Sequence, residues 1–149
     1  MKIYMDACCF IRLSDASIHD RIVLEAKAIT AILEISATKN WTIFKSKPLE
    51  LELKNAKYPL DAAKAAYRAA TTEYLPMPAT NTVESYYQTY GIDPLDSLHL
   101  SIAQENQVDI FLTTDARLLK RGTKAQSGIK DPVKIANPID FFMEITDGN

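Results

Sequence analysis

Cysteine is scarce in this chain, whose only two cysteines are the adjacent Cys8 and Cys9. Neighbouring residues at the end of a strand point in opposite directions, so we expect two small buried thiols rather than a disulfide or a zinc site. No such staple is needed, because a chain of 149 residues can bury about 70% of its unfolded surface. We therefore expect one domain that spans residues 1–149.

Long apolar runs and an excess of basic charge are also missing. No run approaches the roughly 18 apolar residues of a membrane span. The chain does not start with a basic and then apolar leader, so we expect a cytoplasmic protein with no membrane partner. The 17 Lys and Arg residues against 19 Asp and Glu residues give a formal charge of −2. Broad capture of nucleic acid usually needs a strongly basic domain, so any contact with nucleic acid must be local.

Short apolar runs alternate with amphipathic segments along the chain. The expected strands are 1–5, 41–44, 109–113 and 133–136. The expected helices are 19–38, 48–56, 61–72, 80–90, 93–106, 116–121 and 139–145, with a break at 57–59 and a polar loop at 123–131. This alternation predicts an α/β layer structure with a mainly parallel sheet and right-handed crossovers.

Four acidic residues occur on elements that we expect to be buried. An unpaired charge there costs several kcal/mol, so the four carboxylates need a partner. Two of them follow strands, and ligands of open α/β sheets bind beyond the carboxyl ends of strands where strand order reverses. Hard oxygen ligands in this number favour Mg²⁺ or Mn²⁺, and such metals chiefly serve phosphate chemistry. The four residues are Asp6, Glu52, Asp96 and Asp115.

Structural roles compete with this hypothesis. Asp115 could simply cap the helix 116–121. Asp93 and Asp96 have the spacing of a capping box. Capping would fully explain why an acid stands at Asp93. It explains the acid at Asp96 less well, because Asp96 shares a helical stripe with His99. We expect His99 to be a satisfied helix histidine beneath the site rather than a metal ligand, because no second histidine stands at ligand spacing.

The periodicity of the helix 48–56 separates its two glutamates. Glu50 lies four residues before Lys54, in the favoured order for a solvated ion pair. Glu52 shares its face with Leu49 and Leu53, so its charge is expected to point inward. Glu52 is therefore the preferred site residue, with Glu50 as the alternative.

Basic and hydroxyl residues near the acids are candidates for holding phosphate, with solvated surface charge as the competing interpretation. Arg117, Lys120, Arg121 and Lys124 share one helical face beside Asp115. Further candidates are Arg12 for a phosphate, and Ser46 and Thr114 for hydrogen bonds near the metal.

The same segments, taken in order, resemble the PIN-domain nuclease family, which includes VapC-like toxins. IYMDACCFIR is similar to the first strand of the family with its leading Asp, and SKPLELEL to the segment that carries its Glu. LDSLHLSIA is similar to the family's D-A-x-H-x-A helix, FLTTDARLLKR to its TxD strand end, and KIANPIDFF to its closing strand and helix. One departure is Cys8, which stands where the family often has a polar residue.

The resemblance implies a three-layer α/β/α PIN-like fold and a metal-dependent ribonuclease, often the toxin of a toxin–antitoxin pair. One or two Mg²⁺ or Mn²⁺ ions would be held by the four acids, directly by Asp6, Asp96 and Asp115, and by Glu52 directly or through water. RNA is the implied substrate, with a small antitoxin and a homodimer as expected partners. Without metal, such close charges should raise at least one carboxyl pKa.

A catalytically degenerate module that binds proteins is the alternative. A receiver domain or an Asp-x-Asp phosphatase would need a second acid beside the first strand, whereas Asp6 is followed by Ala7 and Cys8. The degenerate scaffold remains open, although all four acids are present.

Overall fold

Five parallel strands form the centre of the computed structural model, which describes residues 1–56 and 59–147. The order across the sheet is β3-β2-β1-β4-β5, and every neighbouring pair is parallel. The predicted α/β architecture with a parallel sheet is therefore confirmed. The strands are β1 (Lys2–Met5), β2 (Thr42–Lys45), β3 (Thr71–Tyr74), β4 (Ile110–Leu112) and β5 (Lys134–Ala136).

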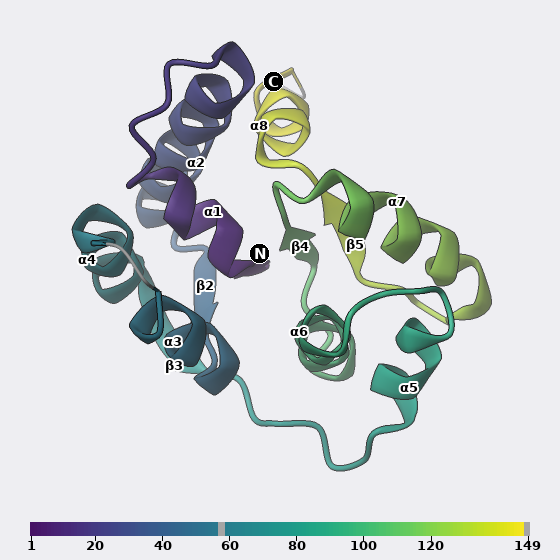
Figure 1. The fold of residues 1–149 in the computed structure, drawn as a ribbon. Coiled ribbons are helices and arrows are strands. Elements are labelled where there is room, and N and C mark those ends of the chain that lie inside the picture. The colour runs from purple at the N-terminus through teal and green to yellow at the C-terminus, as the bar shows by residue number, and fades with distance from the viewer. Residues whose placement is uncertain (57–58, 148–149) are drawn as a thin grey trace.

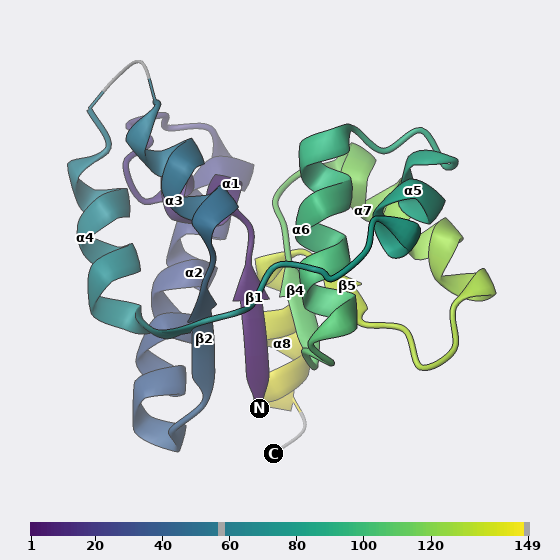
Figure 2. The ribbon, with the colours of Figure 1, turned by 90° about the horizontal axis from the view of Figure 1, so that it is seen from below.

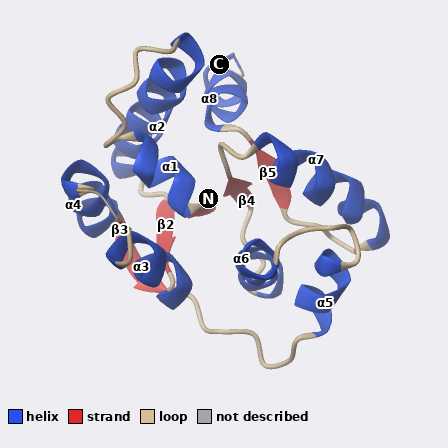
Figure 3. Ribbon diagram, viewed as in Figure 1, coloured by secondary structure: helices blue, strands red, loops and turns tan. Residues whose placement is uncertain are grey.

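Helices cover both faces of this sheet and complete three layers (Figures 1 and 3). On one side α2 packs against α8, and on the other α5 packs against α6. No helix in the described part of the chain combines the length and apolar character needed to cross a bilayer. The helices are α1 (Ala7–Arg12), α2 (Asp20–Lys39), α3 (Lys47–Lys54), α4 (Asp61–Ala70), α5 (Thr82–Gln88), α6 (Pro94–Glu105), α7 (Ala116–Ala125) and α8 (Pro138–Asp147), with a 3-10 turn at Gln126–Gly128.

Strand order reverses between β1 and β4. The chain runs outward from β1 through β2 to β3, and it then returns to place β4 on the other side of β1. The register aligns Ile3 with Ile110 and Met5 with Leu112, so the two strands end at the same level. Figure 2 shows β1 rising from the N-terminus, with α1 at its far end. The crevice expected for a ligand therefore opens beyond Met5 and Leu112.

The central strands are buried on both faces. Ile3, Tyr4 and Met5 on β1 and Phe111 and Leu112 on β4 have no exposed surface. Such continuous apolar strands are typical of parallel sheets covered by helices. Because these strands are packed on both faces, they fix the direction in which the residues that follow each strand leave the sheet.

Two elements differ from the prediction. Segment 71–74 was assigned to a helix end and a loop, but it forms the edge strand β3. Only Thr71 is buried there and the next three residues are exposed, so the segment has no apolar alternation. The predicted strand end at Cys8 and Cys9 is the first turn of α1 instead. Both thiols are free, as expected, with Cys9 buried and Cys8 partly buried.

Several predicted helix ends also shift. The helix predicted at 80–90 spans Thr82–Gln88, and the one predicted at 61–72 ends at Ala70. The helix predicted at 116–121 continues to Ala125, so the polar loop predicted at 123–131 was partly wrong. Part of the break predicted at 57–59 lies outside the described residues. These shifts stay at element ends, where patterns are weakest.

Candidate metal centre

Asp6 follows β1 and is the N-cap of α1. Its side chain is only 5% exposed. Its Oδ1 accepts a hydrogen bond of 2.8 Å from the amide of Ala7. Its Oδ2 accepts one of 3.1 Å from Thr113 Oγ1 at the end of β4. The carboxylate is therefore held in one orientation across the junction of the two central strands.

Thr113 connects two of the predicted acids. Its hydroxyl donates to Asp6, and the same oxygen accepts a hydrogen bond of 3.1 Å from the amide of Asp115. Thr114, a predicted candidate for a hydrogen bond near the metal, donates its amide to Cys8 Sγ at 3.3 Å. Cys8 Sγ also lies 3.4 Å from Asp6 Oδ2. Asp6 is thus held by Thr113, and Cys8 adds a weaker contact.

Glu52 on α3 reaches a buried histidine. The side chain of Glu52 is 29% exposed, and its Oε1 lies in short hydrogen-bond contact with Nε2 of His99 on α6. His99 is completely buried. Its Nδ1 is 2.5 Å from the hydroxyl of Tyr4, which is 2.8 Å from Ser46 Oγ. Ser46 Oγ also accepts the amide of Leu49 at 3.2 Å as the cap of α3.

The direction of each hydrogen bond from Ser46 through Tyr4 and His99 to Glu52 follows from the Glu52 carboxylate, which is the last acceptor. An ionised carboxylate only accepts, so His99 Nε2 carries the proton that points to Glu52. A neutral imidazole then presents Nδ1 as an acceptor for the Tyr4 hydroxyl. The Tyr4 oxygen is left to accept from Ser46. With a neutral His99, the hydroxyl of Ser46 donates to Tyr4 and the hydroxyl of Tyr4 donates to His99. His99 in turn donates to Glu52 and holds its side chain in place.

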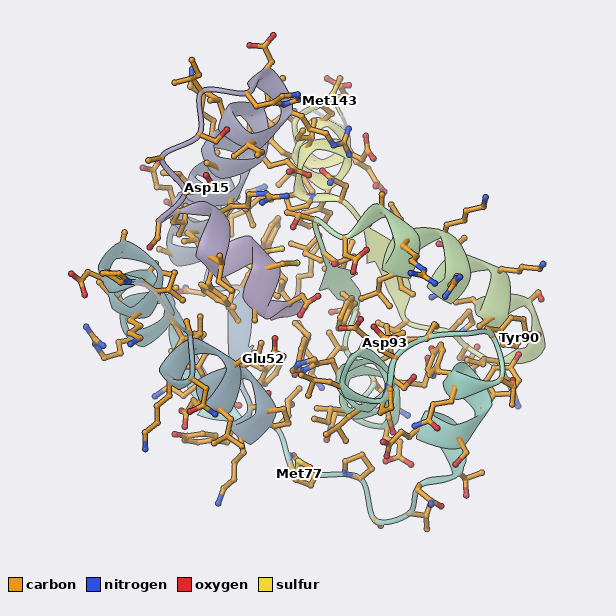
Figure 4. All side chains as sticks on the ribbon, viewed as in Figure 1. Asp15, Glu52, Met77, Tyr90, Asp93 and Met143 are labelled. Atoms are coloured by element: carbon orange, nitrogen blue, oxygen red, sulfur yellow. The ribbon has the colours of Figure 1, made fainter. Side chains whose placement is uncertain are left out.

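Asp6, Glu52 and His99 come together at this end of the sheet, and the two carboxylates are the group's candidates for binding a metal ion. One ligand atom of each lies within 4.8 Å of the ligand atoms of the other two. We call Asp6 and Glu52 the inner pair. In Figure 4 Glu52 lies on the side of α3 that faces α6. The expectation that His99 is a satisfied histidine agrees with its two hydrogen bonds, and its position behind Glu52 was not foreseen.

Asp96 and Asp115, which we call the outer pair, are more open. Asp96 on α6 is partly buried, and Asp115 is exposed at the N-cap of α7. Oδ1 of Asp115 accepts the amides of Arg117 and Leu118 at 3.0 and 3.1 Å. Capping therefore occupies one oxygen of this carboxylate. The outer pair lines one small pocket together with Asp93, Arg117 and Arg121.

Asp93 was expected to cap α6 through its side chain. It does occupy the N-cap position, but no capping hydrogen bond from its side chain is present among the described residues. Its carboxylate is exposed and contributes to the same pocket as Asp96. The capping interpretation therefore does not explain Asp93.

Burial and mutual repulsion raise two carboxyl pKa values. Burial, followed by negative charge at Cys8, Asp96 and Glu52, raises the pKa of Asp6 well above its usual value. Burial, followed by Asp115 and, more weakly, Glu52, raises the pKa of Asp96 to about 6. The predicted rise in at least one carboxyl pKa is present in both pairs. A cation bound there would replace the repulsion with attraction and lower both pKa values.

Glu50 has a role outside this group. The predicted ion pair with Lys54 is absent from the described residues. The carboxylate accepts hydrogen bonds from the hydroxyls of Tyr67 at 3.3 Å and Tyr74 at 2.5 Å. Glu50 therefore joins α3 to α4 and β3, and Glu52 is the glutamate that lies beside Asp6.

The predicted phosphate ligands divide into two kinds. Arg12 donates Nε to the buried Glu25 at 3.0 Å and pairs with Asp15 at 3.6 Å, so its charge has structural partners. The four basic residues of α7 line one groove, as their spacing predicted. Arg117, Lys120 and Lys124 are exposed, and Arg121 is partly buried.

The donor set fits a hard divalent cation. Four carboxylates at one end of the sheet offer oxygen ligands, the chemistry that Mg²⁺ and Mn²⁺ prefer. Two of these carboxylates resist ionisation in the absence of a cation. Asp6 and Glu52 lie within ligand distance of each other, whereas Asp96 and Asp115 are not part of that group among the described residues. Asp96 still raises the pKa of Asp6, and Asp115 raises that of Asp96, so the charges of the two pairs lie near one another.

Comparisons with known proteins bear on the fold alone. No protein-family model matches the chain, and no curated protein matches it significantly. A similar solved structure is the crystal structure of PAE2754 from Pyrobaculum aerophilum, with a TM-score of 0.60 and 13% sequence identity. The similarity covers 99% of this chain and 98% of that one. The two chains share the α/β fold over their full lengths.

Proposed function

We propose that this chain is a metal-dependent ribonuclease of the PIN-domain family that acts in the cytoplasm as the toxin of a toxin–antitoxin pair. The observation that carries the proposal is the meeting of Asp6, Glu52 and His99 at the point where strand order reverses. Asp96 and Asp115 extend this group toward a pocket that also contains Arg117 and Arg121.

The inner pair would hold Mg²⁺ or Mn²⁺ from the protein side, and the outer pair from the open side. A bound divalent cation activates water at neutral pH and stabilises negative charge on a phosphodiester. Thr113 keeps the Asp6 carboxylate oriented, and His99 does the same for Glu52. Fixed ligands lower the cost of assembling the site before substrate arrives.

Arg117 and Arg121 provide positive charge beside the acids. Both line the pocket of the outer pair. A phosphodiester whose non-bridging oxygens face these guanidiniums would bring its phosphorus toward the carboxylate cluster. The net charge of −2 is compatible with this role, because these cations act locally. The proposed substrate is therefore RNA bound by a small basic surface.

Cleavage of a labelled RNA tests the proposal directly. We expect cleavage with Mg²⁺ or Mn²⁺ and none with excess chelator, because the carboxylates themselves only hold the cation, and the cation activates the attacking water. Restoring the metal should restore cleavage. Cleavage that continues unchanged in excess chelator would contradict the metal-dependent mechanism.

Thermal melts separate a working centre from a degenerate scaffold. Metal at a hundredfold excess over its Kd stabilises the folded chain by about 2.7 kcal/mol. For this chain length that corresponds to roughly 5 to 10 °C in Tm. The rise should disappear when Asp6→Asn and Asp115→Asn are combined, because one ligand of each pair is then lost. An equal rise in both proteins would place the metal elsewhere.

A further inference from the structure

A groove between α5 and α7 continues from the outer pair. Its lining consists of Thr89, Tyr90, Arg117, Lys120, Arg121 and Lys124. Arg117 and Arg121 belong both to this groove and to the pocket that holds the outer pair. Any chain of phosphates that reached the acids past these two arginines would therefore lie next to the groove.

One wall of the groove is a row of cations. Arg117, Lys120 and Lys124 lie at intervals of three and four residues on α7, so they share one face. The helical rise spreads them over about 10 Å. All three are exposed. Arg121 instead donates to the carbonyl of Gly91 and holds the loop after α5 against α7. Because Arg117, Lys120 and Lys124 have no ion pair within the described part of the chain, they are suited to binding successive negative charges.

The other wall presents an aromatic ring. Tyr90 is partly buried and follows α5, and Figure 4 places it between α5 and α7. Its ring packs against Tyr86 with centroids 5.4 Å apart. Tyr86 donates to the carbonyl of Ala125 at the end of α7 with a 2.6 Å hydrogen bond. Tyr86, which packs against the Tyr90 ring, is thus itself attached to the end of α7.

Gly91 permits the close approach of this loop to α7. Its φ is +77°, a conformation that favours glycine. A Cβ at this position would lie 3.1 Å from Nη1 of Arg121. Gly91 thus allows the backbone next to Tyr90 to lie directly against the Arg121 side chain of α7.

We infer that this groove binds a nucleotide next to the scissile phosphate, with its base against Tyr90 and its phosphates along Arg117, Lys120 and Lys124. The inference rests on the proposed function for its substrate class. An aromatic ring beside a cationic track is how proteins hold single strands, because any base can stack while the cations follow the backbone. A base in a duplex is already stacked and paired, so the subsite selects unpaired RNA.

Binding of two matched probes tests the subsite separately from catalysis. One probe is a fluorescent twelve-nucleotide oligoadenylate, and the other is the same ribose–phosphate chain without bases, both in Ca²⁺ with intact RNA verified afterwards. Tyr90→Leu should weaken oligoadenylate binding by about 5- to 100-fold and leave the baseless chain unaffected. Tyr90→Phe keeps the ring and should bind as the original protein does.

Lys124→Gln provides a second variant that does not alter the aromatic wall. It should weaken binding of both probes and reduce the salt slope of log K by about 0.7. Lys27→Gln makes the same charge change at an exposed position on α2 and serves as the control. Circular dichroism and Tm confirm that each variant folds.

The outcomes distinguish the two proposals. Equal binding of both probes by the original protein, or no effect of Tyr90→Leu, overturns the subsite even if metal-dependent cleavage occurs. Loss of oligoadenylate binding in Tyr90→Leu supports the subsite even if no RNA is cleaved, in which case the proposed ribonuclease fails. If cleavage occurs, Tyr90→Leu should raise KM more than it lowers kcat.

Discussion

The inner and outer pairs of carboxylates lie at the same end of the sheet but in different surroundings. Asp6 is buried and bound by Thr113 and the amide of Ala7, and Glu52 is held by His99. Asp115 is exposed, and one of its oxygens is used by the start of α7. The inner pair is therefore oriented by the protein before any cation binds, whereas the outer pair remains open to solvent and substrate.

In the proposed metal centre, this difference would give the two pairs different roles. Preoriented ligands fix where a cation sits, because their geometry does not depend on it. Open ligands leave coordination positions for water and phosphate. The basic groove begins beside the outer pair, on the open side. Substrate would therefore enter past Asp96 and Asp115 and never pass the inner pair.

The largest effect is expected from a matched pair of substitutions on one helix. Asp96→Asn should lower the cleavage rate by more than about 100-fold. Loss of a residue that only supports a metal ligand usually lowers activity by about 10- to 100-fold, so a larger loss is expected for a direct ligand. Asp93→Asn changes the same charge in the same pocket, three residues earlier, and should change cleavage only a few-fold. Initial rates at saturating Mn²⁺ measure both. Similar losses in the two variants would mean that the pocket acts through total charge and that no single outer ligand matters.

A smaller effect is expected from Tyr4→Phe, which tests whether the hydrogen bonds behind Glu52 matter for activity beyond their contribution to packing. Tyr4→Phe removes the hydroxyl that donates to His99, so cleavage should fall by about 10-fold through looser positioning of Glu52. Stability should fall by about 1 to 3 kcal/mol because His99 Nδ1 loses its partner. The midpoint for Mn²⁺ activation should rise, which packing defects alone would not cause.

Tyr87→Phe is the control for that variant. Tyr87 is another fully buried tyrosine, and its hydroxyl has no hydrogen-bond partner among the described residues. Its removal should leave the Mn²⁺ midpoint unchanged and stability unchanged or improved. If Tyr87→Phe shifts the midpoint as far as Tyr4→Phe does, the buried chain from Ser46 to Glu52 has no special role.

The smallest effect concerns pH and the metal-free protein. The folded pKa of Asp96 is about 6, above its ordinary value of 3.8. The folded state therefore binds the proton more tightly, and the charged form costs stability at every pH above about 6. As pH falls through 6 toward 3.8, protonation removes that cost.

Metal-free Asp96→Asn should consequently melt a few degrees above the original protein at pH 7.5, and the gap should shrink to about half near pH 5 and close below about pH 4. Melts of both proteins in chelator over this range give the result. The difference between the two proteins isolates Asp96 from other titrating groups. A gap that widened on acidification would show that the folded pKa of Asp96 lies below its ordinary value.

Local patterns were sufficient for most of the architecture. The apolar runs at 3–5 and 110–112 predicted buried strands. Proline and glycine residues predicted several helix ends. Strand β3 escaped because a short edge strand with one buried residue has no period-two signal. Helix α1 escaped because its six residues are too few for a helical period. The position of Asp6 was predicted correctly, although the helix that it caps was not.

The sequence by itself determined the residue types at the site and the elements that carry them, because periodicity records which side chains face the interior. It also distinguished Glu52 from Glu50 by helical phase. Only the tertiary structure decided that Thr113 supports Asp6, that His99 supports Glu52, and that Tyr90 lies beside the cations of α7. Each of these contacts joins elements distant along the chain, and its geometry depends on the packing of the whole sheet rather than on any local pattern.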